Sequence, residues 1–453
     1  MNGSPDPAPA PAPTSRPTSR RRLAAALLTV LLVRLVPVLA FGPDGPPPAG
    51  DLMVYPTVAR HLAASAPAWV QQGNEFGYRA PLFFVYLATA YKIIPTGSYA
   101  VAQVASILLG VLACYLVFLL GRRLGGSRAA WAAFWIRGLL PPFILFDTFP
   151  MTESLFASLL IGAILLVLAS MNAPSFKKSI VLGVLIGLTA LTRDSALAYP
   201  ILFGGALWIA TRRTRRSHIH LLLFVLFLLI TVLPWMVRNQ VVWGRPLPIA
   251  NTSGVNLYIG NNPESTGKHV ETELALPDDV LWGSPAFSRY HGAAAVRYIR
   301  ENPERFVGMG FRKLSWLLFP SFHRDFLRTL YDPPASAVLV ISLLAGATSA
   351  IFLVVGLAGL LLRRAGPFTW ITLAVTAYLL AGTFVAHGHP RYRDPIDQLL
   401  VLHAALLLTG WREIIRELAE HTPRFRTRLA LLLVLLLYLL FNWGWVGLTK
   451  AGA

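Results

Sequence analysis

The stretch "LAAALLTVLLVRLVPVLAF" (residues 23–41) decides the fold class, because its only charged residue is Arg34. An apolar helix needs about 20 residues to cross a bilayer. Three arginines, at residues 20–22, directly precede it. The segment has features of a signal peptide, but its leader is long and many further apolar segments follow. We therefore expect an uncleaved first membrane helix.

The composition extends this expectation to the whole chain of 453 residues. Hydrophobic residues make up 55% of it and charged residues only 13%, whereas soluble domains carry about 25% charge. Too few polar side chains are present to cover a soluble surface, so we predict an all-α polytopic membrane protein. The single cysteine, Cys114, excludes a disulfide within the chain.

Eleven apolar segments are predicted to span the membrane, and the basic residues between them set the orientation. The predicted spans are 23–41, 99–120, 129–146, 153–171, 179–193, 195–211, 219–237, 336–362, 367–386, 396–411 and 428–448. Lys and Arg cluster in residues 121–128, 176–178, 211–216, 361–364 and 411–428. Basic loops stay in the cytoplasm, so we expect the N-terminus inside and the C-terminus outside. The net charge of +19 reflects this bias, and we expect no nucleic-acid partner.

Two long outer loops follow from this orientation, at residues 42–98 and 238–335. Residues 81–94 are too short to cross the membrane and predict a helix that dips in from the surface. Residues 285–318 have amphipathic spacing and both charge signs, which predicts helices lying on the outer surface. The basic, Pro- and Ala-rich residues 1–22 predict a disordered cytoplasmic tail.

Charged residues gather in the predicted outer loops, close to the hydrocarbon. They are Asp51, Glu75, Arg79, Asp147, Glu153, Arg193, Asp194, Arg238, Arg391 and Arg393, with Tyr392 among them. Charges at this depth are costly, so each is a candidate for a functional site. Pairing with one another or with lipid headgroups is the alternative for all of them.

The stretch "GPPPAGDLMVYPTVARHL" (residues 47–64) puts a carboxylate at the rim of this region. Asp51, Tyr55, Val58 and Leu62 follow the spacing of one helix face. Asp51 is suited to act as a general base beside a dry cavity. It is also suited to cap the N-terminus of that helix, and the sequence leaves both roles open.

Five segments, taken in order, resemble the GT-C membrane glycosyltransferases of the family 39/83 type, which include protein O-mannosyltransferase-like and lipid A sugar-transferase-like members. They are "LLVRLVPVLAF…GDLMVYPTVARHL…GYRAPLFFVYLATAY", "FDTFPMTESLFASLL" (146–160), "LTALTRDSALAYPILF" (188–203), "LPWMVRNQVVWGRPLPIANTSGVNLYIGNNP" (233–263) and "HPRYRDPIDQLLVLHAA" (389–405). The resemblance covers residues 23–411 and implies one transmembrane transferase domain there. A cytoplasmic loop at 412–427 and the last span with the C-terminus at 428–453 complete the predicted organisation.

The resemblance implies that a sugar moves from a polyprenyl phosphate to an acceptor hydroxyl, with inversion at the anomeric carbon. Asp51 would be the catalytic base, and Glu153 and Asp147 would position the acceptor or hold a metal. The substrate-binding candidates are Tyr55, Arg79, Arg193, Arg238, Asn256, Tyr258, Asn261, Arg391, Tyr392 and Arg393. Arginine suits the lipid phosphate because its planar fork of donors fits phosphate oxygens. The asparagines suit sugar hydroxyls, although ordinary turn chemistry explains them as well.

The cofactor, the acceptor and a rival class stay open at this stage. Oxygen ligands are compatible with Mg²⁺ or Mn²⁺, but Tyr78 stands where the lipid A-modifying members have a glutamate. The expected acceptor is an envelope glycolipid, polysaccharide or protein, at the outer face of a bacterial inner (cytoplasmic) membrane. The alternative is a secondary transporter or a flippase of lipid-linked saccharides. Such carriers usually show internal repeats and helices broken near the bilayer midplane, and the sequence shows neither.

Overall fold

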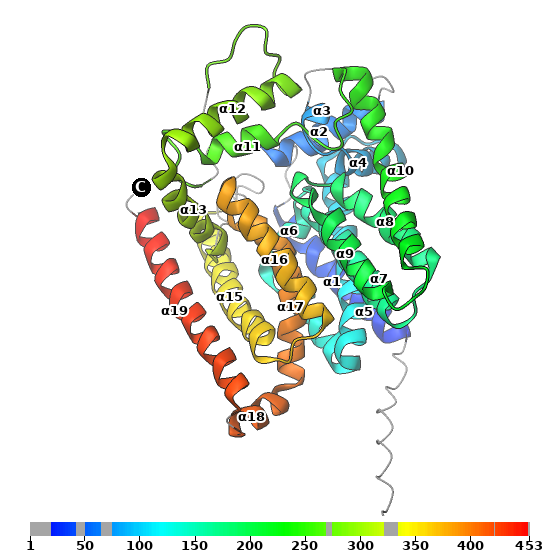
Figure 1. Cartoon of the computed structure of the whole chain (residues 1–453), viewed down its shortest axis with the longest axis vertical. Helices are drawn as coiled ribbons and strands as arrows, with labels where there is room; N and C mark the ends of the chain where they lie inside the picture. Colours follow the sequence, from blue (N-terminus) through cyan, green and yellow to red (C-terminus); the bar gives the residue numbers. More distant parts are fainter. Residues whose placement is uncertain are drawn as a thin grey trace, which may run out of the picture.

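The computed structural model describes residues 20–41, 50–64, 75–268, 274–320, 334–420 and 422–451. These residues form a bundle of helices, with no strand among them (Figure 1). The predicted all-α architecture is therefore confirmed.

The helices of the first half of the chain are α1 (Arg20–Phe41), α2 (Asp51–Ala64), α3 (Glu75–Tyr78), α4 (Leu82–Ile93), α5 (Tyr99–Leu139), α6 (Pro141–Thr148), α7 (Glu153–Asn172), α8 (Phe176–Ala190), η2 (Asp194–Ala196), α9 (Tyr199–Thr211) and α10 (Ser217–Trp243). Those of the second half are α11 (Ser253–Gly260), α12 (Pro285–Glu301), α13 (Pro303–Leu318), α15 (Ala335–Leu362), α16 (Pro367–Val385), η3 (Pro390–Arg393), α17 (Asp394–Thr409), α18 (Trp411–Ala419) and α19 (Pro423–Ala451). Each of the predicted spans coincides with helix in this set. The short helix predicted at 81–94 is α4, and the helices predicted at 285–318 are α12 and α13.

Length and composition support a multi-pass membrane protein. Within the described ranges, 7 helices are long and apolar enough to cross a bilayer, or 8 if α17 and α18, bent by 67°, count as one span. Leu229, Leu343 and Val434 on these helices expose 52%, 62% and 66% of their surface. Such outward apolar side chains suit contact with lipid rather than water. The number of eleven spans stays a prediction, because α8 and α9 are short.

The long helix α5 is a hairpin of two helices rather than one rod. Gly125 and Gly126 leave the helical conformation, and Gly126 has φ 74°. A Cβ on Gly121 would lie 3.0 Å from the carbonyl oxygen of Ala129, and Phe118 packs against Phe134 in one apolar cluster. The chain therefore reverses at the predicted loop 121–128, as two separate spans require.

The basic segments between the spans lie together at one end of the bundle. Arg363 donates to the Leu406 carbonyl at the end of α17, and a Cβ on Gly125 would touch Leu406. Arg123 reaches the Leu168 carbonyl at the end of α7. Figure 1 shows α18 at this end and α2, α3, α11 and α12 at the opposite end. The predicted segregation of basic loops is thus present in the fold, while its assignment to the cytoplasm is a prediction.

An apolar core lies between the two ends of the bundle and packs several of its helices against one another. Phe156 of α7, Tyr199 of α9 and Leu399 of α17 are all fully buried within one continuous apolar cluster. Between membrane helices such side chains stabilise the fold through van der Waals packing. Because α7 and α17 pack in this core, the residues that begin each of them are brought close together.

Candidate active site

Five charged residues form a continuous network at the end of the bundle that carries α2 and α3. Arg79 Nη1 donates to Asp51 Oδ1 at 2.6 Å, and Arg391 Nη1 donates to Asp51 Oδ2 at 2.5 Å. Arg391 Nε also donates to Glu153 Oε1, which Arg193 Nη1 reaches at 3.2 Å. We call these five residues the outer charge network. Its charges alternate in sign from Arg79 to Arg193 and leave one positive charge in excess.

Helix ends supply the members of this network. Asp51 is the first residue of α2, and Gly50 before it adopts φ 77°, which turns the chain into the helix. Glu153 is the first residue of α7, where a carboxylate favours the positive end of the helix dipole. Arg391 lies in η3, whose first turn is capped by the His389 side chain accepting from the Arg391 backbone amide at 3.1 Å. Segments far apart in sequence therefore meet at one place.

Exposure falls along the network from Arg79 to Glu153, and Arg193 at its far end is 11% exposed. The side chains of Arg79 and Asp51 are 26% and 20% exposed, that of Arg391 is 11% exposed, and that of Glu153 is 1% exposed. A ligand that arrives from outside therefore meets Asp51 and Arg79 first. Glu153 is enclosed and is suited to hold Arg391 and Arg193 in place.

Aromatic side chains pack around the outer charge network. Tyr55, one turn along α2 from Asp51, packs edge-on against Phe83 at 5.2 Å and lies 5.9 Å from the Arg79 guanidinium. Burial, followed by the nearby Asp51, raises the pKa of the Tyr55 hydroxyl, so it stays neutral. At the other end, the Tyr392 ring lies 5.8 Å from the Arg193 guanidinium.

His387 is a residue that the sequence reasoning missed. Its ring lies 5.2 Å from that of Tyr392, and its Nε2 lies 3.4 Å from Asn256 Oδ1 on α11. The residue connects the predicted asparagine of the second outer loop to the wall of the network. Its position four residues before Arg391, in "HGHPRYRDP", is the signal that could have identified it.

The remaining predicted residues lie outside the outer charge network. Asp147 is fully buried and bound by Arg34 and Arg137. Arg393 donates to Asp397 at 2.9 Å and to the backbone carbonyls of Leu317 and Phe319, and not to the acids that Arg391 binds. Through these contacts Arg393 holds the end of α13 against the start of α17.

Three further predicted residues pack in other surroundings. Arg238 is buried on α10, with its guanidinium 4.9 Å from the Trp235 ring. Asn261 donates to the Val385 carbonyl at 2.8 Å and accepts from Lys313 at 2.9 Å. Tyr258 packs against the His291 ring. The contacts of Asn261 and Tyr258 join α11 to the helices around it.

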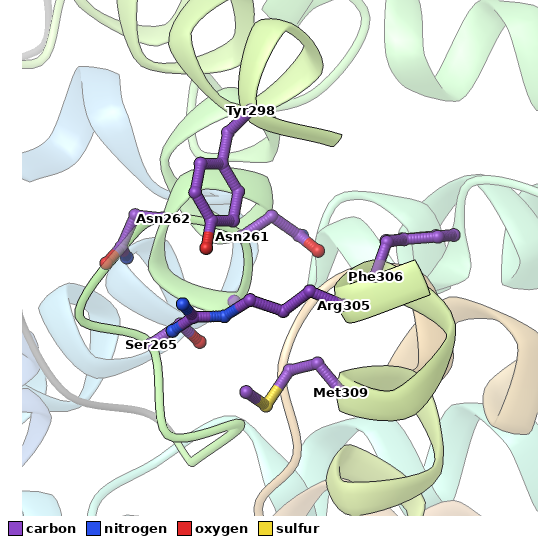
Figure 2. A pocket seen from close by; sticks show the side chains of 8 residues that line it. Asn261, Asn262, Ser265, Tyr298, Arg305, Phe306 and Met309 are labelled. Carbon is purple, nitrogen blue, oxygen red and sulfur yellow. The ribbon is translucent and has the colours of Figure 1, made fainter. Parts of the chain in front are cut away.

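A small pocket lies beside this loop rather than in the outer charge network. Figure 2 shows Asn261, Asn262 and Ser265 on one side and Arg305 reaching towards them from α13. Arg305 Nη2 donates to the Pro263 carbonyl at 2.6 Å. The asparagines here satisfy backbone carbonyls, which favours the turn-chemistry explanation for Asn261 and Asn262.

Residues suited to a divalent cation are poorly arranged here. In the described part of the chain, no group of three or more His, Cys, Asp or Glu side chains is placed to hold a metal ion. The two acids of the network, Asp51 and Glu153, share the guanidinium of Arg391 between them. A cation at that position would be repelled by the arginine, so this arrangement does not fit a resident metal.

Asp194 lies beside the network with a carboxylate oxygen that no described group donates to. It is half-buried, and its Oδ1 is enclosed. Burial raises the pKa of this carboxyl from 3.8 to about 6, while Arg79 and Arg193 oppose the shift. The folded state therefore binds the proton more tightly than the unfolded chain.

We expect Asp194→Asn to raise the melting temperature at pH 8 and to change it little near pH 4. Above pH 6 the carboxylate is ionised in both states, and its burial costs folding free energy that the neutral amide does not. That cost disappears as the pH falls from 6 towards 4. Thermal unfolding of both proteins from pH 4 to 8 measures this, with the exposed Asp278→Asn as control. An equal gain in melting temperature at all pH values would contradict the raised pKa of the Asp194 carboxyl.

Comparison with known families agrees with the resemblance seen in the sequence. Residues 78–237 match the family described as dolichyl-phosphate-mannose-protein mannosyltransferase. The matched stretch includes Arg79, Asp147, Glu153 and Arg193. This match covers about a third of the chain, and with the multi-pass helical fold it makes the chain similar to the GT-C membrane glycosyltransferases. Nothing in it favours a transporter or a flippase.

Two solved structures of one protein are similar to this chain. ArnT from Cupriavidus metallidurans in the apo state has 17% sequence identity and a TM-score of 0.40, with 85% of this chain and 77% of that chain covered. The same protein bound to undecaprenyl phosphate has 17% identity and a TM-score of 0.41, with 87% and 78% covered. A search of curated proteins finds no match.

Proposed function

We propose that this protein transfers one sugar, a hexose or a pentose, from a polyprenyl-phosphate donor to a cell-envelope acceptor, with inversion at the anomeric carbon. The acceptor is a glycolipid, a polysaccharide or a protein. The reaction takes place at the outer face of a bacterial cytoplasmic membrane, with the N-terminus in the cytoplasm. The observation that carries the proposal is the outer charge network, in which Asp51 is bound by both Arg79 and Arg391.

The charge of the network suits a lipid phosphate. A sugar joined to a polyprenyl chain through one phosphate carries a single negative charge, and Arg79 and Arg391 carry two positive charges against the one carboxylate of Asp51 that they share. When the lipid phosphate leaves the sugar, it carries a second negative charge. Guanidinium groups that are already in position stabilise that charge. Arg79 and Arg391 present their guanidinium groups from two sides of Asp51, so both are suited to grip the phosphate oxygens.

The partial exposure of Asp51 supports its role as the base. Both of its carboxylate oxygens accept from arginine, at 2.6 Å and 2.5 Å. Donor phosphate competes for the same guanidinium groups, and their movement towards it frees a carboxylate oxygen. That oxygen takes the proton of the acceptor hydroxyl as the hydroxyl oxygen attacks the anomeric carbon. The bond from that carbon to the phosphate oxygen breaks, and its electron pair stays on the phosphate.

The family match supports this function over the transport alternative, and a reconstituted assay separates the two. Purified protein in lipid vesicles receives labelled polyprenyl-phosphate sugars and envelope extracts, and mass spectrometry follows the sugar. Transfer of label to a new acceptor is expected. Movement of intact donor across the bilayer without a new bond would instead identify a flippase.

The proposed orientation is tested with reporters at residues 125, 214 and 265. The first two lie in basic loops and are expected in the cytoplasm, whereas residue 265 follows α11 and is expected outside. A cytoplasmic signal at residue 265 would reject an outward-facing site.

A further inference from the structure

A second cluster of charges lies inside the bundle, beneath the outer charge network. Arg34 of α1 binds Asp147 Oδ2 at 2.8 Å, and Arg137 of α5 binds the same carboxylate through two nitrogens at 2.7 Å and 2.9 Å. All three side chains are 0–1% exposed. Removing one partner from such a buried group leaves an uncompensated charge. The carboxylate of Asp147 is therefore fixed, and it has no route to an incoming acceptor.

One connection leads from Asp147 to Glu153. Ser154 Oγ donates to Asp147 Oδ1 at 2.6 Å, and Ser154 is 2% exposed. Ser154 directly follows Glu153 in the first turn of α7. The hydrogen bond therefore fixes the rotation of this turn about its axis, and with it the direction in which Glu153 points.

A second connection leads from the same cluster to Arg391. Arg137 Nε donates to Gln398 Oε1 at 2.8 Å, and Gln398 Nε2 donates to Asp394 Oδ1 at 2.9 Å. The backbone amide of Asp394 donates to the Arg391 carbonyl. Gln398 and Asp394 are 1% and 3% exposed. Arg137 thus anchors the turn that carries Arg391 through a chain of buried hydrogen bonds.

We propose that Asp147 is a positioning residue, and that through Ser154 and through Arg137 and Gln398 it sets the two halves of the Glu153–Arg391 pair. The consequence for catalysis rests on the proposed function, whereas the mechanical connection does not. Glu153 and Arg391 begin different helices and are 238 residues apart in sequence, so nothing local fixes their relative position. A misplacement of about 1 Å can cost roughly 10²-fold in rate, and a shared anchor prevents it.

Two substitutions cut the connections without leaving the central charges unpaired. Ser154→Ala removes the first connection, and Gln398→Met removes the second at similar volume. Asp147 itself is unsuitable, because its loss leaves two buried arginines together. Matched controls lie on the same helices: Ser170→Ala removes a buried hydroxyl bonded to the Leu166 carbonyl at the other end of α7, and His403→Met removes a buried partner of Thr372.

Hydrogen–deuterium exchange tests the connections without requiring activity. In detergent-purified protein, Ser154→Ala should speed exchange severalfold in residues 150–156, and Gln398→Met should do so in residues 387–394. The controls should leave both segments unchanged. Equal exchange in each variant and its control overturns the proposal, whether or not the wild type transfers sugar.

Kinetics separate positioning from simple stability. We expect both variants to lower kcat/KM of the folded protein for the polyprenyl-phosphate donor at least tenfold, whereas the controls leave it within twofold. Gln398→Met also takes the donor from the buried Asp394 Oδ1, so its melting temperature should fall as well. Faster exchange with unchanged kcat/KM would reject the positioning role. Failure of the wild type to transfer any sugar would reject the proposed function. The hydrogen–deuterium exchange result would still show whether the two hydrogen-bonded connections position Glu153 and Arg391.

Discussion

Replacement of Asp51 by asparagine should lower the rate of sugar transfer by about 10²- to 10⁴-fold, the range that general acid–base catalysis contributes. Asparagine keeps the size of the side chain and an oxygen that can accept from Arg79 or Arg391, but it cannot take a proton from the acceptor hydroxyl. The effect should therefore appear in kcat. Initial rates with labelled donor at saturating acceptor measure it.

The fold should survive this change. The Asp51 side chain is 20% exposed, and pairs of this kind near a surface contribute only about 0–1 kcal/mol. Asp278→Asn makes the same substitution at an exposed position of the second outer loop and should leave transfer within twofold of the wild type. Full activity in Asp51→Asn would show that another group accepts the proton.

The positions of the helices could be predicted because they depend on local composition. Apolar runs of about 20 residues find no stable place outside a bilayer, and the basic residues between them sort to one side. The structure confirms helices at each predicted span and brings basic segments such as 121–128 and 361–364 to one end. The meeting of Asp51, Glu153 and Arg391 at the other end follows from the same rule.

The partners of individual charges could not be predicted, since they depend on how helices rotate and pack. Arg391 and Arg393 are two residues apart in one motif, yet the η3 turn sends the first to Asp51 and Glu153 and the second to Asp397. Asp147 was a candidate for catalysis because it lies in a predicted outer loop, but Arg34 and Arg137 enclose it. No periodicity in the sequence reports these long-range pairings.

Replacement of Arg391 by methionine should abolish detectable donor binding and also destabilise the protein by about 3–5 kcal/mol, the cost of breaking a buried ion pair. Arg391 is the one described residue that binds both Asp51 and Glu153. Its loss leaves Glu153, 1% exposed, with Arg193 alone. Arg393→Met is the matched control, because it removes a buried arginine from the same turn. It should destabilise the protein similarly while leaving the affinity of the remaining folded fraction for the donor unchanged.

A double substitution separates the two effects of Arg391. In Arg391→Met with Glu153→Gln, the buried carboxylate that lost one of its two arginine partners is gone, so most of the stability should return, as replacement of whole buried pairs by neutral groups is often tolerated. Donor binding should not return, because no guanidinium then faces Asp51 from that side. Thermal unfolding and titration with a fluorescent polyprenyl phosphate measure the two quantities on one preparation. Restored binding in the double variant would mean that Arg391 acts only by neutralising Glu153, and that Arg79 alone holds the phosphate.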